Sequence, residues 1–201
     1  MLFLVLIEKI AGRITVNNFS GSTDFLGINY YLSHVVRGVT DDETPPSQSE
    51  RDGSYAFVEG KWEKICGDTW IRYAPDGLLA LLKYVKETYN NIPVFITENG
   101  CPDIVGEEKK PVEEILKDTH RIKYITGHLE VVAKAIEEGC NIIGYTLWTL
   151  MDNFEWDDGF ELRFGICRVD FESPEKTRTM KQSAKFYQNF IREFKKHHNL
   201  L

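Results

Sequence analysis

The sequence has no long apolar run and no basic block. No segment approaches the roughly 20 consecutive apolar residues that a membrane-spanning helix needs, so we expect no transmembrane segment. The apolar start, residues 1–7, lacks a basic flank and ends at a Glu-Lys pair, which makes it a poor secretory signal. With 31 acidic residues against 24 Lys and Arg and no basic cluster, the chain has nothing to match nucleic-acid phosphates. We therefore expect no nucleic-acid partner and no membrane partner.

The sequence has only four cysteines, and none of them forms a C-x-x-C pair. Cys66, Cys101, Cys140 and Cys167 lie far apart with no accompanying row of histidines, so their spacing argues against a structural zinc site. We expect free or core thiols and no bound metal. A disulfide stays open as an alternative because the number is even, but so few cysteines do not indicate a disulfide-stapled scaffold.

The composition, with 42% hydrophobic and 12% aromatic residues, is typical of a globular protein with an ample core. Three apolar segments predict buried strands, and each is followed by a segment with helical apolar spacing. The strands are expected at 25–31, 92–97 and 141–148, and the helices at 74–89, 111–139 and 177–195. Strands that alternate with helices predict an α/β fold with a parallel sheet. At this pace a closed eight-unit barrel needs roughly 400 residues, so the chain is either a smaller open sheet or part of a barrel.

The stretch VFITENG, residues 94–100, places a carboxylate at the end of an apolar run. Asn99-Gly100 is a strong hairpin signal, and a β-hairpin is one interpretation of it. Pro102 follows closely, however, and a proline cannot donate to a strand ladder, which disfavours a return strand. The other interpretation places Glu98 at the carboxyl end of a parallel strand, where α/β folds build their sites.

Two further groups of aromatic and polar residues follow predicted strands. The segment 148–160 contains Trp148, Glu155 and Trp156, and flat rings beside carboxylates suit the wall of a sugar-binding site. The alternative is a solvated acidic loop whose rings cover one end of the fold. The first strand ends in Asn29-Tyr30-Tyr31, whose tyrosines are equally compatible with core packing. Beside Glu98, a tyrosine hydroxyl would orient the carboxylate and stabilise its charge.

Together, the motifs FLGINYY, VFITENG and TLWTLMDNFEW, followed by FGICRVD and KQSAKFY, resemble the C-terminal part of family 1 glycoside hydrolases, the β-glucosidase family. The resemblance covers nearly all of the chain from about Asp24 onward. It implies an α/β protein of the (β/α)8 TIM-barrel family, with this chain carrying roughly strands six to eight and their helices, a partial barrel. We divide the chain accordingly into a divergent N-terminal junction, residues 1–20, and the C-terminal part of a glycoside hydrolase barrel, residues 21–201.

The resemblance also implies a reaction and the residues that carry it. Glu98 takes the place of the nucleophile of a retaining mechanism, which forms a glycosyl-enzyme ester, and Tyr31 takes the place of the residue that orients this nucleophile. The pair Glu155-Trp156 resembles family members that act on plain rather than phosphorylated sugars. The implied substrate is a β-glucoside or a related small glycoside, with no metal and no organic cofactor. The implied substrate-binding residues are Asn29, Trp148, Glu155, Trp156 and Phe164.

The sequence departs from the family in one respect that concerns the chemistry. A retaining glycosidase needs a second carboxyl group as acid and base; the family supplies it from an Asn-Glu-Pro motif on strand four, and this chain has no Asn-Glu-Pro. Nothing in the sequence indicates a raised pKa for the nearby candidates, which are Asp103, Asp152, Asp157 and Asp158. We therefore expect this fragment to be inactive, with the missing N-terminal barrel half required for a closed site.

The alternative function is a non-catalytic, truncated product that binds a carbohydrate or a protein partner. The sequence does not fix the compartment. Asn18-Phe19-Ser20 matches the N-glycosylation sequon, which leans towards a secreted or lysosomal location.

Overall fold

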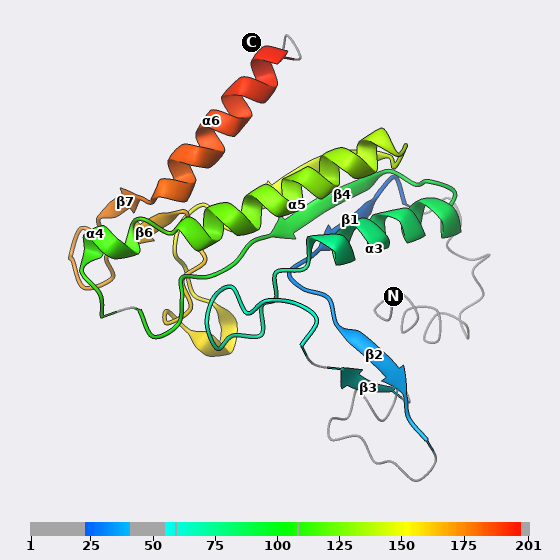
Figure 1. The fold of residues 1–201 in the computed structure, drawn as a ribbon. Coiled ribbons are helices and arrows are strands. Elements are labelled where there is room, and N and C mark those ends of the chain that lie inside the picture. Colours follow the sequence, from blue (N-terminus) through cyan, green and yellow to red (C-terminus); the bar gives the residue numbers. More distant parts are fainter. Residues whose placement is uncertain (1–22, 41–54, 59, 108, 198–201) are drawn as a thin grey trace.

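The computed structural model describes residues 23–40, 55–58, 60–107 and 109–197. Its centre is a three-stranded parallel sheet in the order β1-β4-β5 (Figure 1). The strands overlap the three predicted ones and span Leu26–Asn29 (β1), Val94–Asn99 (β4) and Ile142–Leu147 (β5). The prediction of an α/β fold with a parallel sheet is confirmed. The expected junction at residues 1–20 and the Asn18 sequon lie outside the described residues.

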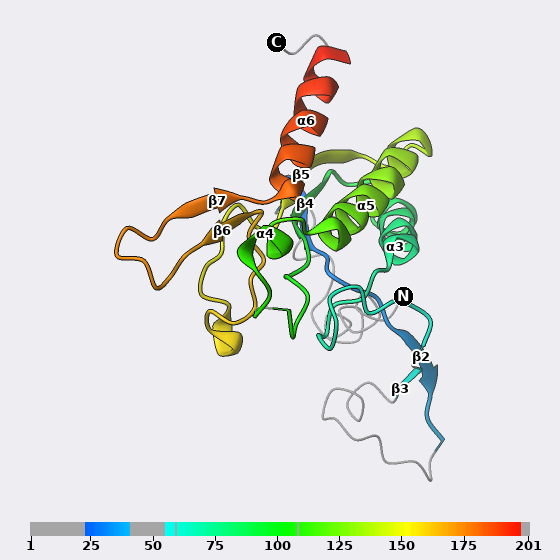
Figure 2. The ribbon, with the colours of Figure 1, turned by 60° about the vertical axis from the view of Figure 1, so that its left-hand side comes forward.

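Two helices cover one face of this sheet, α3 (Pro75–Thr88) and α5 (Thr119–Glu137). They lie side by side and contact each other (Figures 1 and 2). Proline suits the first turn of α3, where its missing N–H has no intrahelical partner to lose. Burial of each large apolar side chain contributes about 1.5–3 kcal/mol, so this layer is the main core. Its buried members include Leu78, Leu82, Val85, Val94, Ile96, Val132 and Ala135.

The predicted single helix over residues 111–139 is wrong in its continuity. The structure has a short α4, Val112–Ile115, and a separate α5 that begins at Thr119. The break lies at Asp118, whose carboxylate accepts hydrogen bonds from the Ser183 backbone N–H at 2.9 Å and from the Ser183 hydroxyl at 2.6 Å. These tertiary bonds outweigh helix propensity, which is a weak preference. The end of α5 before Gly139, which has a φ of 83°, agrees with the prediction.

The predicted last helix, residues 177–195, begins later than expected. Its first residues form β7 (Arg178–Met180), which pairs antiparallel with β6 (Cys167–Val169), and the helix α6 spans Gln182–His197. A second unpredicted hairpin joins β2 (Val35–Gly38) to β3 (Tyr55–Val58). These strands of three or four residues are too short to give a periodic signal.

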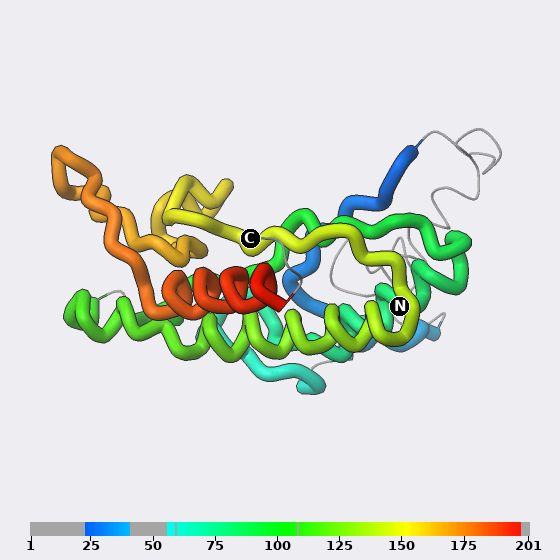
Figure 3. The backbone as a smooth tube through the Cα atoms, turned by 90° about the horizontal axis from the view of Figure 1, so that it is seen from above, coloured from blue at the N-terminus to red at the C-terminus, as the bar shows by residue number. Residues whose placement is uncertain are grey.

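Helix α6 starts against α5 (Figure 3) and runs away from the sheet (Figures 1 and 2). Its first turns place Ala184 and Phe186 next to Ile125 and Leu129 of α5. Further along, it exposes Phe190, Ile191 and Phe194 by 38–49%. No helix among the described residues is long and apolar enough to span a membrane.

The second face of the sheet carries no covering helix from the described part of the chain. Phe25 and Ile143 are 44% and 57% exposed, and the Phe25 ring packs on Phe95 at a centroid distance of 6.1 Å, with the ring planes tilted by 52°. Among the residues that the structure describes, β1 and β5 each pair with β4 alone, so both form edges of this sheet. The structure is therefore a sheet with one covered face and one uncovered face.

The core contains a titratable side chain, His128 of α5. It lies among the rings of Tyr30, Tyr73 and Tyr124. Its Nδ1 is 2.8 Å from the Tyr124 carbonyl oxygen, whereas Nε2 has no hydrogen-bond partner among the described residues. Burial lowers the pKa of His128 to about 4, because a charged imidazole would lose its hydration there.

Replacing His128 by leucine is expected to weaken the fall of the free energy of unfolding between pH 6.5 and pH 4. An unfolded chain binds a proton at this imidazole near pH 6.5, whereas the folded chain does so only near pH 4. The wild-type free energy of unfolding should therefore fall as pH drops through this window, by up to about 3 kcal/mol. Urea unfolding across the window measures this slope. The control His197→Leu, in an exposed position of α6, should keep it; an unchanged slope in His128→Leu would refute the assignment.

Candidate active site

Glu98 lies near the end of β4, next to the hydroxyl of Tyr31. The hydroxyl donates a hydrogen bond to Glu98 Oε2 at 2.6 Å. Parallel pairing brings the two together, since Asn29 of β1 is the register partner of Glu98 and the chain continues from Asn29 to Tyr31. Burial and the bond to Glu98 raise the pKa of Tyr31, so the phenol stays protonated and keeps donating. One carboxylate oxygen of Glu98 thus has a fixed donor.

The direction of the Glu98 side chain depends on an irregularity in β4. The register shifts between Ile28 and Asn29 on β1, and between Ile96 and Asn99 on the side of β5. Without it, two-residue alternation would place Glu98 on the same face as Ile96, under the helices. Bulges of this kind re-aim side chains. Here the irregularity places Asn99, instead of Glu98, in the buried layer.

Asn99 is fully buried and connects three segments. Its side-chain amide donates to the Tyr30 carbonyl oxygen at 2.7 Å and to the Tyr124 hydroxyl at 3.2 Å. Its side-chain oxygen accepts from the Tyr145 hydroxyl at 2.7 Å. The sequence marks this residue only as part of an Asn-Gly turn signal, and its partners lie far away in the chain. Residues 100–107 form no return strand, and β4 pairs in parallel with β1 and β5, so the hairpin interpretation is wrong.

Gly100 allows the end of β4 to approach the end of β5. A Cβ atom at this position would lie 1.7 Å from the Trp148 carbonyl oxygen. The backbone N–H of Trp148 donates to the Asn99 carbonyl oxygen at 2.9 Å, and the peptide bond between Trp148 and Thr149 is cis. The close approach requires glycine, because any other residue would push these two strand ends apart.

Trp148 and Glu155 form the second side of the site. Trp148 lies beside the Glu155 carboxylate. Burial raises the pKa of Glu155, the Trp148 side chain lowers it, and the negative charges of Asp158 and Glu98 act in the same direction as burial. Phe164, 2% exposed, packs edge-on against Tyr31 at a ring distance of 6.0 Å. The structure thus gathers Tyr31, Glu98, Trp148, Glu155 and Phe164 at the carboxyl ends of the strands.

Two of the predicted site residues stand apart from this group. Trp156 begins the short 3-10 helix η2, Trp156–Asp158, and is 83% exposed. Asn29 is exposed, and its side-chain oxygen accepts a hydrogen bond from the Thr97 hydroxyl at 2.6 Å. Within the described residues, neither one is hydrogen-bonded to Glu98.

Two of the nearby aspartates are fully engaged elsewhere. Asp103 lies 2.7 and 2.8 Å from Lys181 Nζ and 2.6 Å from Arg121 Nη2. Burial alone would raise the pKa of Asp103, but these two cations lower it. Asp152 accepts from the backbone N–H groups of Gly165 and Val169 at 3.0 and 3.1 Å. Neither carboxyl group is suited to deliver a proton to a substrate.

Comparison with known sequences confirms the resemblance. The chain matches the profile of glycosyl hydrolase family 1 over residues 13–196. It is 37% identical over 182 residues to beta-glucosidase 11 of Oryza sativa subsp. japonica, covering 86% of this chain and 33% of that protein. It is 40% identical over 201 residues to beta-glucosidase 30 of Arabidopsis thaliana, covering 94% of this chain and 34% of that protein. The chain spans about a third of the length of these curated relatives.

Solved structures agree with the sequence comparison. The chain is similar to a rice beta-glucosidase with a TM-score of 0.72 at 36% identity, over 83% of this chain and 36% of that one. Beta-glucosidase 2 of the fungus Trichoderma reesei gives a TM-score of 0.74 at 34% identity, over 87% and 38%. A mutant rice beta-glucosidase in a covalent complex with Glc gives 0.72 at 35% identity, over 83% and 36%. These structures have the TIM-barrel fold, and the chain matches about a third of each.

Proposed function

Because the chain belongs to glycosyl hydrolase family 1, we propose that it forms the part of a retaining β-glycosidase that supplies the nucleophile, Glu98. The observation that carries this proposal is the 2.6 Å hydrogen bond from Tyr31 to Glu98 at the end of a parallel strand. It fixes Oε2, while Oε1 accepts no hydrogen bond from the described residues. Oε1 is therefore the atom that attacks the anomeric carbon.

In the first step, the bond from Oε1 to the anomeric carbon forms as the bond to the leaving oxygen breaks. The product is a glycosyl ester of Glu98, which water then hydrolyses with overall retention of configuration. The covalent complex with Glc recorded for a similar rice beta-glucosidase supports an ester intermediate of this kind. The Tyr31 hydrogen bond holds the carboxylate in its attacking orientation. It therefore reduces the orientational freedom that the carboxylate must lose when it reacts.

The substrate class that we propose is a β-glucoside or a related small glycoside. Trp148 offers a flat face to the sugar ring, and the neighbouring Glu155 carboxylate accepts hydrogen bonds from sugar hydroxyls. Asn29, Trp156 and Phe164 complete this sugar site in the proposal. The similar proteins are named as beta-glucosidases, from plants and a fungus, which favours glucosides.

We place the chain at strands six to eight of the barrel, as β1, β4 and β5. In this position its uncovered sheet face lines the barrel interior. Among the described carboxyl groups with a shifted pKa, Glu155 is the one whose pKa is raised, and this proposal assigns it to sugar binding beside Trp148. We infer that the acid and base comes from the N-terminal barrel half and that this chain has no turnover by itself.

The test is covalent trapping in the complete protein that contains this chain. A 2-fluoro-glucoside with an activated leaving group slows hydrolysis of the ester and depends little on a general acid, so the intermediate should accumulate. Peptide mapping by mass spectrometry should then locate the label on Glu98. A label on a different carboxylate would overturn the assignment of the nucleophile.

A carbohydrate-binding product without turnover is the second candidate function. The Trp148–Glu155 pair favours it, because that pair forms within this chain alone. Glucose or cellobiose should then change the tryptophan fluorescence of the isolated chain while an aryl β-glucoside stays intact. If no sugar changes the fluorescence, this candidate fails.

A further inference from the structure

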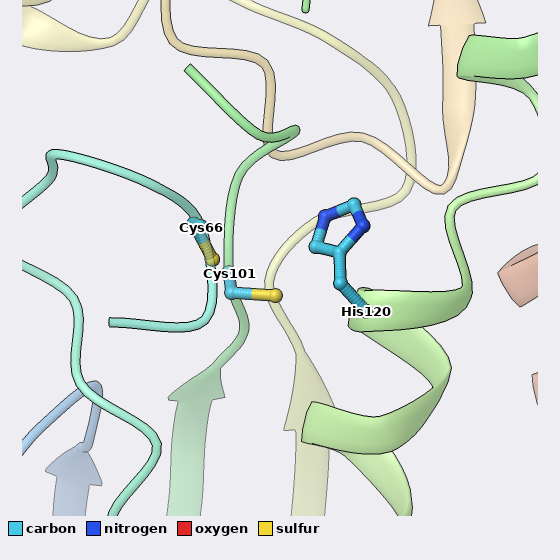
Figure 4. A group of neighbouring side chains, drawn as sticks. All are labelled: Cys66, Cys101 and His120. Atoms are coloured by element: carbon cyan, nitrogen blue, oxygen red, sulfur yellow. The ribbon is translucent and has the colours of Figure 1, made fainter. Parts of the chain in front are cut away.

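Three side chains with metal-ligating atoms converge behind the candidate active site. Cys66 comes from the connection after β3, Cys101 from the loop directly after β4, and His120 from the first turn of α5 (Figure 4). Their two sulfur atoms and one ring nitrogen all lie within 4.8 Å of one another. Both cysteines are fully buried, and His120 is partly buried. We propose that Cys66, Cys101 and His120 bind a zinc ion.

The geometry fits a tetrahedral ion after small side-chain movements. Zinc binds thiolate sulfur at about 2.3 Å and imidazole nitrogen at about 2.0–2.1 Å, which places neighbouring ligand atoms about 3.5–3.8 Å apart. The observed limit of 4.8 Å therefore leaves roughly 1 Å of adjustment. The Pro102 carbonyl oxygen, 3.0 Å from His120 Nε2, holds the ring beside the sulfur atoms. A water molecule supplies the fourth ligand on the partly exposed side of His120.

The donor set and the surrounding charges select the ion. Two thiolates and one imidazole favour zinc over magnesium or calcium, which prefer oxygen ligands. Two thiolates also balance a divalent cation, so the filled site adds no net charge to a buried region. Arg121, whose Nε donates to the Cys101 carbonyl oxygen at 3.0 Å, is already paired with Asp103 and Asp118. It therefore leaves no unpaired positive charge beside the ion.

The spacing of the cysteines in the sequence argues against such a site, and the fold reverses that conclusion. The connection after β3, the loop after β4 and α5 meet only because β1 and β4 pair in parallel and α5 packs over them. An ion at this place would join all three segments. It would fix the loop that follows β4, the strand that carries Glu98, whatever the substrate of the site.

The experiment is a cobalt titration of the reduced, chelator-treated chain under anaerobic conditions. Co²⁺ should give a near-ultraviolet thiolate-to-metal absorption band and the intense visible bands of a tetrahedral site, and one zinc ion per chain should remove both. Each of Cys66→Ser, Cys101→Ser and His120→Gln should weaken zinc binding by about 100-fold or more. The matched control is Cys167→Ser, because Cys167 is a free cysteine outside this cluster and should leave binding unchanged.

Three outcomes would overturn the proposal. The wild-type chain could give no thiolate-to-cobalt band, or Cys66→Ser could retain the full band and affinity. The third outcome concerns a disulfide. Glutathione disulfide could oxidise Cys66 and Cys101 to a disulfide, with the loss of two thiols and the release of two reduced glutathione molecules. If the chain then binds no cobalt after it is reduced again, the pair is a redox pair and not a metal site. Circular dichroism checks that each variant folds. If a variant does not fold, the cobalt absorption spectrum of the wild-type chain still tests the proposal. None of these measurements depends on glycosidase activity.

Discussion

Replacing Glu98 by glutamine is expected to lower the turnover of an aryl β-glucoside by about 10³-fold or more in the complete protein. The amide keeps the size of the side chain and can still meet the Tyr31 hydroxyl, but it is a very poor nucleophile. The loss therefore reports on the chemistry and not on folding. Steady-state rates with a chromogenic β-glucoside measure it.

Two further measurements make the Glu98 result specific. Glu161→Gln changes an exposed carboxylate in the same connection as Glu155 and should leave turnover unchanged. In Glu98→Ala, which leaves a small space, added azide should restore turnover and give a glycosyl azide of inverted configuration, because azide attacks from the side that Glu98 occupied. Full turnover in Glu98→Gln would show that Glu98 is not the nucleophile.

Replacing Arg121 by methionine is expected to lower the free energy of unfolding by about 3–5 kcal/mol. The Arg121 side chain is fully buried and pairs with Asp103 and Asp118, while it also donates to the Cys101 and Arg163 carbonyl oxygens. Burial alone would lower the pKa of Arg121, but the two aspartates raise it, so the guanidinium stays charged. Methionine would leave buried carboxylates without a counter-charge. Because small domains have only about 5–15 kcal/mol of stability, much of it would be lost.

The matched control for Arg121 is two positions along the same helix. Lys123 pairs with Glu63 at 2.5 Å, but both side chains are more than half exposed to solvent. Lys123→Met should therefore change stability by no more than about 1 kcal/mol. Urea unfolding measures both variants. If both variants lose the same free energy of unfolding, the buried Arg121 network stabilises the fold no more than an exposed ion pair does. If Arg121→Met does not fold, Lys181→Met tests the same network from its second buried cation.

The parts of the fold that the sequence predicts are those with a strong local signal. The apolar runs that form β4 and β5 are local signals, and so are Pro75 at the start of α3 and Gly139 after the end of α5. Where a tertiary contact decides, prediction fails. Asp118 breaks a helix because its partner is Ser183, far along the chain.

The candidate site also has a part that the sequence predicts and a part that depends on tertiary contacts. Glu98 and Tyr31 are predictable as neighbours, since parallel strands end at one edge. The buried role of Asn99 is not predictable, because its partners belong to three distant segments. The pairing of Asp103 with Lys181 is not predictable for the same reason, because the two residues lie far apart in the sequence. The cluster of Cys66, Cys101 and His120 is a further case, since spacing rules recognise metal ligands only when they are close in sequence.

The contact between Gly100 and the Trp148 carbonyl oxygen sets the distance between the ends of β4 and β5. Backbone atoms touch there with no side chain in between, so the gap is set by atomic radii alone. Rotamer changes, which give most protein surfaces their tolerance, cannot widen or narrow it. The backbone of the strand that carries Glu98 and the backbone at Trp148 therefore keep one separation. In the enzyme that we propose, adaptation to different glycosides would have to take place in the loops around them.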